Sequence, residues 1–255
     1  MKVLQSLIIA MSMYSKIPMP RTTWEKENMK YVMCFFPLVG CVIGVCIYAI
    51  GKFLFSDACG SLLRGAVGTL LPILISGGIH MDGFMDTMDA LSSYGTRERK
   101  LEILKDSHAG AFAILGACCY MVCSVAIWSE VEVQMLKSIA CVYVISRALS
   151  ALSVVTFPAA RTDGLAQGFQ ESAKRNRVCI SSMCYLLIMG VFLWMQGWKM
   201  LLGVGISVGI TFFYYKKICD KQFGGVTGDL AGYFLVLSEL AMITGIVICG
   251  GGLWN

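Results

Sequence analysis

The sequence predicts an all-α fold, a polytopic membrane helical bundle of about seven transmembrane helices preceded by a short interfacial helix. Hydrophobic residues make up 57% of its 255 residues and charged residues only 15%, whereas soluble domains have about 45–50% and about 25%. A water-soluble fold could not bury that much apolar surface. Basic membrane loops account for the net charge of +5, so we expect a lipid bilayer and no nucleic acid as partner.

The individual elements follow from the lengths of the apolar segments. Val3–Tyr14 is shorter than the roughly 20 residues of a full crossing, so we expect it to lie at the membrane interface. Seven longer segments then predict spans near Val32–Phe55, Leu62–Ile79, Gly110–Trp128, Ser138–Phe157, Val178–Gln196, Met200–Tyr215 and Leu230–Gly250. No linker separates them, so residues 1–255 are expected to form a single integral-membrane catalytic domain.

Charge distribution predicts the orientation of the bundle. Alternating the spans places on one side, here called face A, the segments Lys16–Tyr31, His80–Ala109, Pro158–Arg177 and Lys216–Asp229. Face A carries most of the 21 Lys and Arg residues, and the opposite face has only Lys52, Arg64, Lys137 and Lys199. By the positive-inside rule face A is cytoplasmic. We therefore expect a multi-pass protein of the cell (inner) membrane with its active-site loops in the cytoplasm.

The segment from Gly77 to Asp89, GGIHMDGFMDTMD, is the most informative part of face A. Its aspartates Asp82, Asp86 and Asp89 are spaced i, i+4, i+7, which places three carboxylates on one face of a helix. Their mutual repulsion is relieved by a hard cation such as Mg²⁺, which binds a few carboxylates together with a substrate phosphate. His80 precedes them and could exchange a proton. The alternative, a solvated acidic helix face, is disfavoured by the apolar residues between the acids.

Groups that bind phosphate occur in three further segments of face A, namely Lys100–Gly110, Arg161–Leu165 and Gly224–Gly232. The first offers Lys105, Ser107 and free backbone N–H groups at the start of a span, although an ordinary capped helix would look the same. The second offers a base–acid pair, Arg161 and Asp163. The third is Gly-rich, which allows close backbone approach to phosphate, or it is only a flexible turn.

Two charged residues, Arg147 and Glu239, fall inside predicted spans. Facing lipid, each would cost roughly 2.5–3.5 kcal/mol, so we expect both to face the bundle interior. Glu239 lies roughly 15 Å along a helix from Asp229, deeper than the metal candidates. Arg147 would either contact a substrate phosphate, which we favour, or pair with Glu239, whose role we expect to be structural.

Seven segments in a fixed order carry a resemblance to a known family: Lys16–Pro20, Phe36–Gly40, Gly77–Asp89, Leu101–Ser107, Ile145–Arg147, Ala160–Leu165 and Gly224–Asp229. Together they resemble the cobalamin synthase family, adenosylcobinamide-GDP ribazoletransferase, over nearly the whole chain. Each segment alone is a weak signal, whereas the ordered set is specific. Two positions depart from the family pattern: His108 stands where many members have Arg, and Ala90 where Gly is common.

The resemblance implies the joining of adenosylcobinamide-GDP to α-ribazole, or its 5′-phosphate, with release of GMP. It is the last step in assembling the nucleotide loop of vitamin B12. In this hypothesis Asp82 and Asp86 bind Mg²⁺, and Asp229 completes a second metal site. Asp89 is a further ligand or the base for the attacking hydroxyl, with His80 a competing base. The expected substrate and phosphate contacts are Lys105, Asp106, Ser107, Arg147, Arg161, Asp163 and Thr227. Assembly as a homo-oligomer is left open.

Two other classes of protein share part of this pattern. A CDP-alcohol phosphotransferase of lipid synthesis also combines membrane helices, spaced aspartates and Mg²⁺. Its motif D-x2-D-G-x2-A-R is not matched here, because Gly83 directly follows Asp82 and no Ala-Arg pair follows. A membrane transporter would place polar residues at mid-membrane on broken helices, whereas here they gather on face A.

Overall fold

The computed structural model describes residues 2–54 and 59–251, which are almost entirely helical. Within these ranges there is no strand, only an isolated parallel bridge between Ala159 and Val226. Phe55, the expected end of the first span, lies outside the described residues. The elements are α1 (Lys2–Tyr14), α2 (Lys26–Met29), α3 (Val32–Leu54), α4 (Ser61–Ser76), α5 (Ile79–Ser92), α6 (Arg97–Ile103), α7 (Ala111–Ser129), η1 (Val133–Met135), α8 (Leu136–Thr156), α9 (Leu165–Ser172), α10 (Arg175–Gln196), α11 (Trp198–Ile218), η2 (Cys219–Phe223) and α12 (Gly228–Gly250).

The membrane-spanning elements match the predicted polytopic bundle. Six helices of the described chain are long and apolar enough to cross a bilayer, and a seventh span results if the bent pair α4–α5 counts as one. The pair bends by 99°, because Gly77 and Gly78 adopt φ angles of +69° and +80° that other residues rarely adopt. Helix α4 therefore ends at Ser76, three residues before Ile79, the predicted end of that span.

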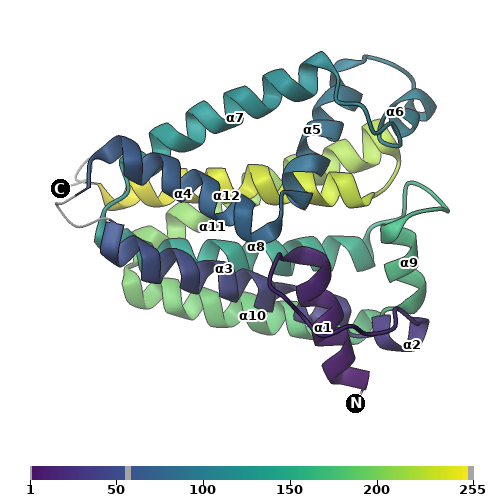
Figure 1. The fold of residues 1–255 in the computed structure, drawn as a ribbon, viewed down its shortest axis with the longest axis horizontal. Helices are drawn as coiled ribbons and strands as arrows, with labels where there is room; N and C mark the ends of the chain where they lie inside the picture. The colour runs from purple at the N-terminus through teal and green to yellow at the C-terminus, as the bar shows by residue number, and fades with distance from the viewer. Residues whose placement is uncertain (1, 55–58, 252–255) are drawn as a thin grey trace.

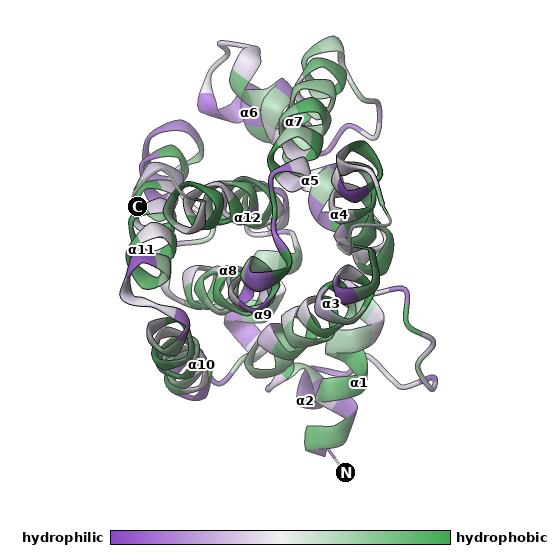
Figure 2. Cartoon of the chain, turned by 90° about the vertical axis from the view of Figure 1, so that its left-hand side faces the viewer, coloured by the Kyte–Doolittle hydropathy of each residue, from purple (hydrophilic) through white to green (hydrophobic). Residues whose placement is uncertain are grey.

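Helices α8 and α12 lie in the middle of the bundle, with α3, α4, α7, α10 and α11 around them (Figures 1 and 2). Small residues permit the closest contact, between α3 and α8. A Cβ atom added to Gly40 would lie 2.2 Å from the carbonyl oxygen of Tyr143, and one added to Gly44 would lie 2.5 Å from that of Ala140. This close approach of backbones is the packing expected where lipid, not water, surrounds the helices.

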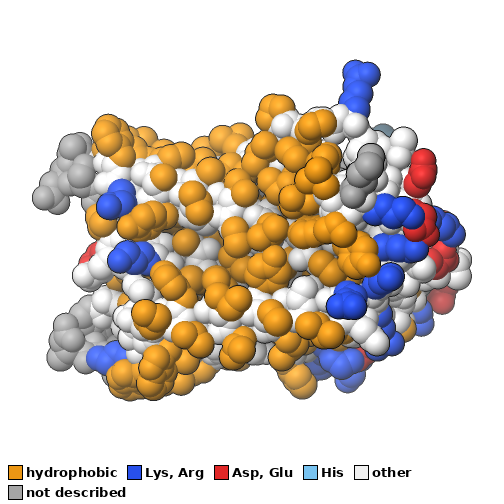
Figure 3. Space-filling view, turned by 90° about the horizontal axis from the view of Figure 1, so that it is seen from below, with side chains coloured by type: hydrophobic (Ala, Val, Ile, Leu, Met, Phe, Trp, Pro, Cys, Tyr) orange, Lys and Arg blue, Asp and Glu red, His pale blue; other side chains and the backbone are white. Residues whose placement is uncertain are grey.

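One end of the bundle carries most of the charged side chains. The short helices α2, α6 and α9 lie at this end, on the right in Figure 1. In Figure 3 the Lys, Arg, Asp and Glu side chains gather at the same end, and hydrophobic side chains cover the flank. The structure therefore contains the separation predicted for face A. Helix α5, which carries the aspartates, turns away from α4 by 99° toward this end (Figure 1).

Candidate active site

Helix α5 carries the aspartate motif, as the spacing predicts. At Gly83 its backbone packs directly on that of α12: a Cβ atom on Gly83 would lie 2.8 Å from the Cα and carbonyl oxygen of Asp229. This contact brings Asp229, in the first turn of α12, to the carboxylates of α5. Asp86 is only partly buried and has Asp82, Asp89 and Asp229 as like-charged neighbours. Two elements far apart in sequence thus build one acidic cluster.

The acidic cluster, defined here as Asp82, Asp86 and Asp229, suits a hard cation. Within the described residues no three His, Cys, Asp or Glu side chains form a ready-made metal cage. Mg²⁺ does not require one, because it usually binds one or two carboxylates and completes its shell with water and substrate phosphates. Carboxylate oxygens that would otherwise repel one another are therefore a fitting donor set for Mg²⁺ bound together with a phosphate.

Asp89 is engaged with a neighbouring helix. Its Oδ2 accepts a hydrogen bond from the backbone N–H of Gly110 (2.6 Å), and its Oδ1 accepts one from that of Ala113 (2.9 Å). These bonds cap the start of α7 with a carboxylate, the charge that the positive end of a helix favours. The expectation that this helix start offers free N–H groups to a phosphate is therefore wrong for Gly110 and Ala113, because Asp89 already occupies them.

The loops before α9 and before α12 join beside the acidic cluster. The backbone N–H of Ala160 donates to the carbonyl of Val226 (3.0 Å), which holds the two loops together. Arg161 Nη2 then lies 3.4 Å from Asp229 Oδ2, and Thr227 Oγ1 donates to the same oxygen at 3.4 Å. The structure thus brings Arg161, Thr227 and Asp229 into contact, and it places the guanidinium of Arg161 next to the acidic cluster.

Two further predicted residues, Lys105 and Asp163, form a solvent-exposed ion pair of 2.7 Å between the end of α6 and the loop before α9. The hydrogen bond and charge of Lys105 lower the pKa of Asp163 below its usual value. Asp106 accepts a hydrogen bond from the backbone N–H of His108 (3.0 Å) and contacts its ring, and these hydrogen bonds lower the pKa of Asp106. Ser107 is exposed between them.

Arg147 and Glu239 form an ion pair inside the bundle, with 2.6 Å between Nη1 and Oε1. Ser146 Oγ donates a further hydrogen bond to Glu239 Oε1 at 2.7 Å. The Arg147 side chain is 1% exposed. The structural role expected for Glu239 is thus present, and the guanidinium of Arg147 is directed to this partner. A phosphate contact by Arg147 stays a prediction.

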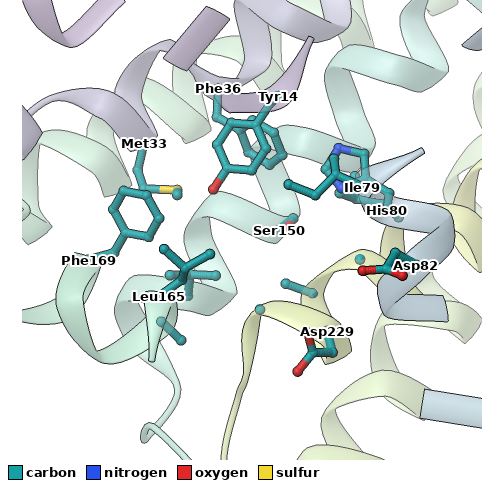
Figure 4. A pocket seen from close by; sticks show the side chains of 16 residues that line it. Tyr14, Met33, Phe36, Ile79, His80, Asp82, Ser150, Leu165, Phe169 and Asp229 are labelled. Atoms are coloured by element: carbon teal, nitrogen blue, oxygen red, sulfur yellow. The ribbon is translucent and has the colours of Figure 1, made fainter. Parts of the chain in front are cut away.

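A cavity of about 280 Å³ adjoins the acidic cluster. Asp82 and Asp229 line one side of it, and aromatic and aliphatic side chains line the other (Figure 4). His80 lines it as well, with its ring stacked on Tyr14 at 5.8 Å between centroids. Within the described residues the buried Nε2 atom of His80 has no hydrogen-bond partner.

Sequence reasoning missed most of this cavity. Its remaining lining residues come from α1, α3, α5, α8, α9 and α12, and they are Tyr14, Met33, Phe36, Ile79, Ser150, Val154, Leu165, Ala166, Phe169, Gly228, Ala231, Gly232 and Leu235. The one local signal is the i, i+4 spacing of Leu165 and Phe169, which places two apolar side chains on one face of a short helix. Nothing local indicates that this face meets Tyr14.

A protein-family model described as "CobS: Cobalamin-5-phosphate synthase" matches residues 6–247. The chain belongs to this family. A relative from Lachnoclostridium phytofermentans, 46% identical over the full length of both chains, is named adenosylcobinamide-GDP ribazoletransferase. Relatives of the same name from Desulfitobacterium hafniense (31% identical, 95% of this chain and 96% of the relative) and Clostridium perfringens (29%, 96% and 97%) cover nearly all of both chains. No solved structure matches the chain.

Proposed function

We propose that this chain joins adenosylcobinamide-GDP to α-ribazole, or to its 5′-phosphate, and releases GMP. Membership of the CobS family and the names of the relatives support this assignment. The structural observation that carries it is the position of the acidic cluster on the wall of a nucleoside-sized cavity. The reaction needs a phosphate-handling centre next to a cavity that can hold a nucleoside portion of one of the substrates.

The proposed reaction is a phosphoryl transfer. A ribose hydroxyl oxygen that is free both in α-ribazole and in its 5′-phosphate attacks the phosphorus attached to the cobinamide arm, a new P–O bond forms, and the P–O bond to GMP breaks. GMP leaves with the bridging oxygen, and the hydroxyl proton passes to a base. Such transfers depend mainly on positioning and on neutralising charge at the phosphoryl oxygens and the leaving group. Arg161, which contacts Asp229, and Lys105, which pairs with Asp163, are the candidate cations for neutralising this charge.

Asp82, Asp86 and Asp229 would hold Mg²⁺ in this proposal. The ion would neutralise charge on the phosphate oxygens. Asp89 would contribute by fixing α7 against α5 through its two hydrogen bonds. His80 is the better candidate for the base than Asp89, because it lines the cavity and its Nε2 is unpartnered within the described residues.

Face A is proposed to be the cytoplasmic side of the cell (inner) membrane, following the basic side chains gathered there. Both substrates would then reach the acidic cluster from the cytoplasm, and the apolar flank would anchor the bundle in the bilayer. This arrangement suits an enzyme served from one side.

The test is a transfer assay on the purified chain in liposomes, given adenosylcobinamide-GDP and α-ribazole with Mg²⁺ or with EDTA. We expect a cobalamin product and GMP with Mg²⁺, loss of both with EDTA, and little activity in Asp82→Asn and Asp86→Asn variants. Full activity in either variant would contradict the metal assignment. Absence of product under all conditions would contradict the proposed function.

A further inference from the structure

The cavity beside the acidic cluster discriminates among the parts of the two substrates by size. Its volume of about 280 Å³ lies near the lower end of small-ligand pockets, roughly 300–1,000 Å³. A bicyclic aromatic base with part of its sugar fits such a space. A corrin macrocycle does not, so the corrinoid body must lie outside the cavity. The adenine of the adenosyl ligand is held on the corrin and stays outside with it, so two bases remain as occupants, the guanine of the GDP portion and the benzimidazole of ribazole.

The walls of the cavity discriminate between these two bases by polarity. Away from the carboxylates, the lining includes the buried apolar side chains of Met33, Phe36, Val154, Phe169 and Leu235, and its polar side chains are those of Tyr14, His80 and Ser150. Guanine carries more hydrogen-bond donors and acceptors along its edge than these three polar side chains can pair, so several would be left unpaired. A dimethylated benzimidazole has apolar edges and aromatic faces, which suit thioether and aromatic side chains.

We propose that this cavity is the subsite for the base of α-ribazole, an inference that rests on the proposed function. The base would lie among Met33, Phe36 and Phe169, with the ribose directed to the side that Asp82 and Asp229 line. This places the ribose hydroxyls of the nucleoside, and not the guanine, next to the acidic cluster. The cavity thereby selects an apolar lower base.

Tyr14 supplies a directional contact to the base in this subsite. Its hydroxyl is directed into the cavity, as Figure 4 shows, and its ring is held by Phe36 at 4.3 Å between centroids. After its glycosidic bond is made, a benzimidazole keeps one unsubstituted ring nitrogen, which accepts a hydrogen bond and donates none. A tyrosine hydroxyl is the matching donor. Helix α1, expected only to lie at the interface, thus acquires a role in substrate recognition.

The first experiment fills the cavity from α9. Ala166 is 5% exposed and lines the cavity, whereas a Cβ atom on Gly168, in the same helix, would meet no atom within 4 Å. Ala166→Leu is expected to raise the KM for α-ribazole at least tenfold, because a single methylene group too many in a hydrophobic pocket weakens a substrate by about that factor. The same variant should leave the KM for adenosylcobinamide-GDP within twofold. Gly168→Leu, the matched control, should leave both within twofold.

A second variant keeps the fold and the cavity volume. Tyr14→Phe removes only the hydroxyl and is expected to weaken α-ribazole about threefold to tenfold, the effect of one hydrogen bond. An analogue with the corresponding indole in place of the benzimidazole has a C–H group where that ring nitrogen stands, so Tyr14→Phe should leave its KM unchanged. Equal loss for both nucleosides would contradict the contact with the ring nitrogen.

The outcomes separate the two proposals. If wild type transfers ribazole but Ala166→Leu leaves its KM unchanged, or raises only the KM for the corrinoid substrate, the subsite assignment is overturned and the function stands. If wild type does not transfer, the proposed function fails. Equilibrium dialysis of α-ribazole and of GMP then decides the subsite: binding of ribazole lost in Ala166→Leu supports it, and binding of GMP lost instead overturns it.

Discussion

Replacing Gly83 by alanine is predicted to push α5 away from α12 and to lower transfer activity about a hundredfold. The added Cβ atom would lie 2.8 Å from the Cα and carbonyl oxygen of Asp229, whereas carbon atoms pack at about 3.5–4.0 Å. Because the opposing atoms are backbone, no change of rotamer relieves the overlap, and the helices must separate by about 0.7–1.2 Å. A misplacement of about 1 Å at a reacting centre can cost 10²-fold in rate.

The assay compares kcat and KM of wild type and Gly83→Ala, together with thermal unfolding in detergent. Overpacking of this kind costs about 1–3 kcal/mol, so the variant should stay folded with a lower Tm while kcat falls. Gly190→Ala is the control, because its Cβ atom would meet no atom within 4 Å, and it should keep its activity within twofold. An unchanged kcat in Gly83→Ala would refute the idea that this contact positions the carboxylates.

Three further predictions concern single side chains. Arg147→Met leaves the buried carboxylate of Glu239 without its ion-pair partner and should cost about 3–5 kcal/mol of stability. The double variant Arg147→Met with Glu239→Leu should regain most of that stability. Equal unfolding temperatures for the single and double variants would count against this. Asp89→Ala removes the cap of α7 and should cost about 0.5–2 kcal/mol, with Asp89→Asn losing less, as thermal melts can check; identical melts for the two would contradict the capping role. Activity of wild type should follow Mg²⁺ concentration, and Asp86→Asn should need more Mg²⁺ for half-maximal rate; an unshifted titration would argue against Asp86 as a ligand.

The sequence predicts those features that depend on one segment alone. The length of each apolar run indicates the spans, and the spacing of Asp82, Asp86 and Asp89 predicts the helix that the structure has as α5. The gathering of charge on face A also follows, because it needs only the alternation of spans. Each of these features depends on a short stretch of sequence, so a local pattern is enough to predict it.

Features that depend on which helices meet could not be predicted. The two oxygens of Asp89 accept hydrogen bonds from the start of α7, although its spacing makes it indistinguishable from Asp82 and Asp86. The 99° bend after α4 requires left-handed φ angles at Gly77 and Gly78, and glycine permits such angles but does not require them. The cavity joins residues as distant as Tyr14 and Phe169, so it appears only once the bundle is packed.

The most direct test of the central claim counts products in sealed vesicles that contain the chain with face A outward. Adenosylcobinamide-GDP and α-ribazole are added outside with Mg²⁺, and GMP and cobalamin are measured on both sides. The account predicts one GMP released per cobalamin formed, both on the outer side, and neither in EDTA. Movement of substrate into the vesicles without release of GMP would contradict it.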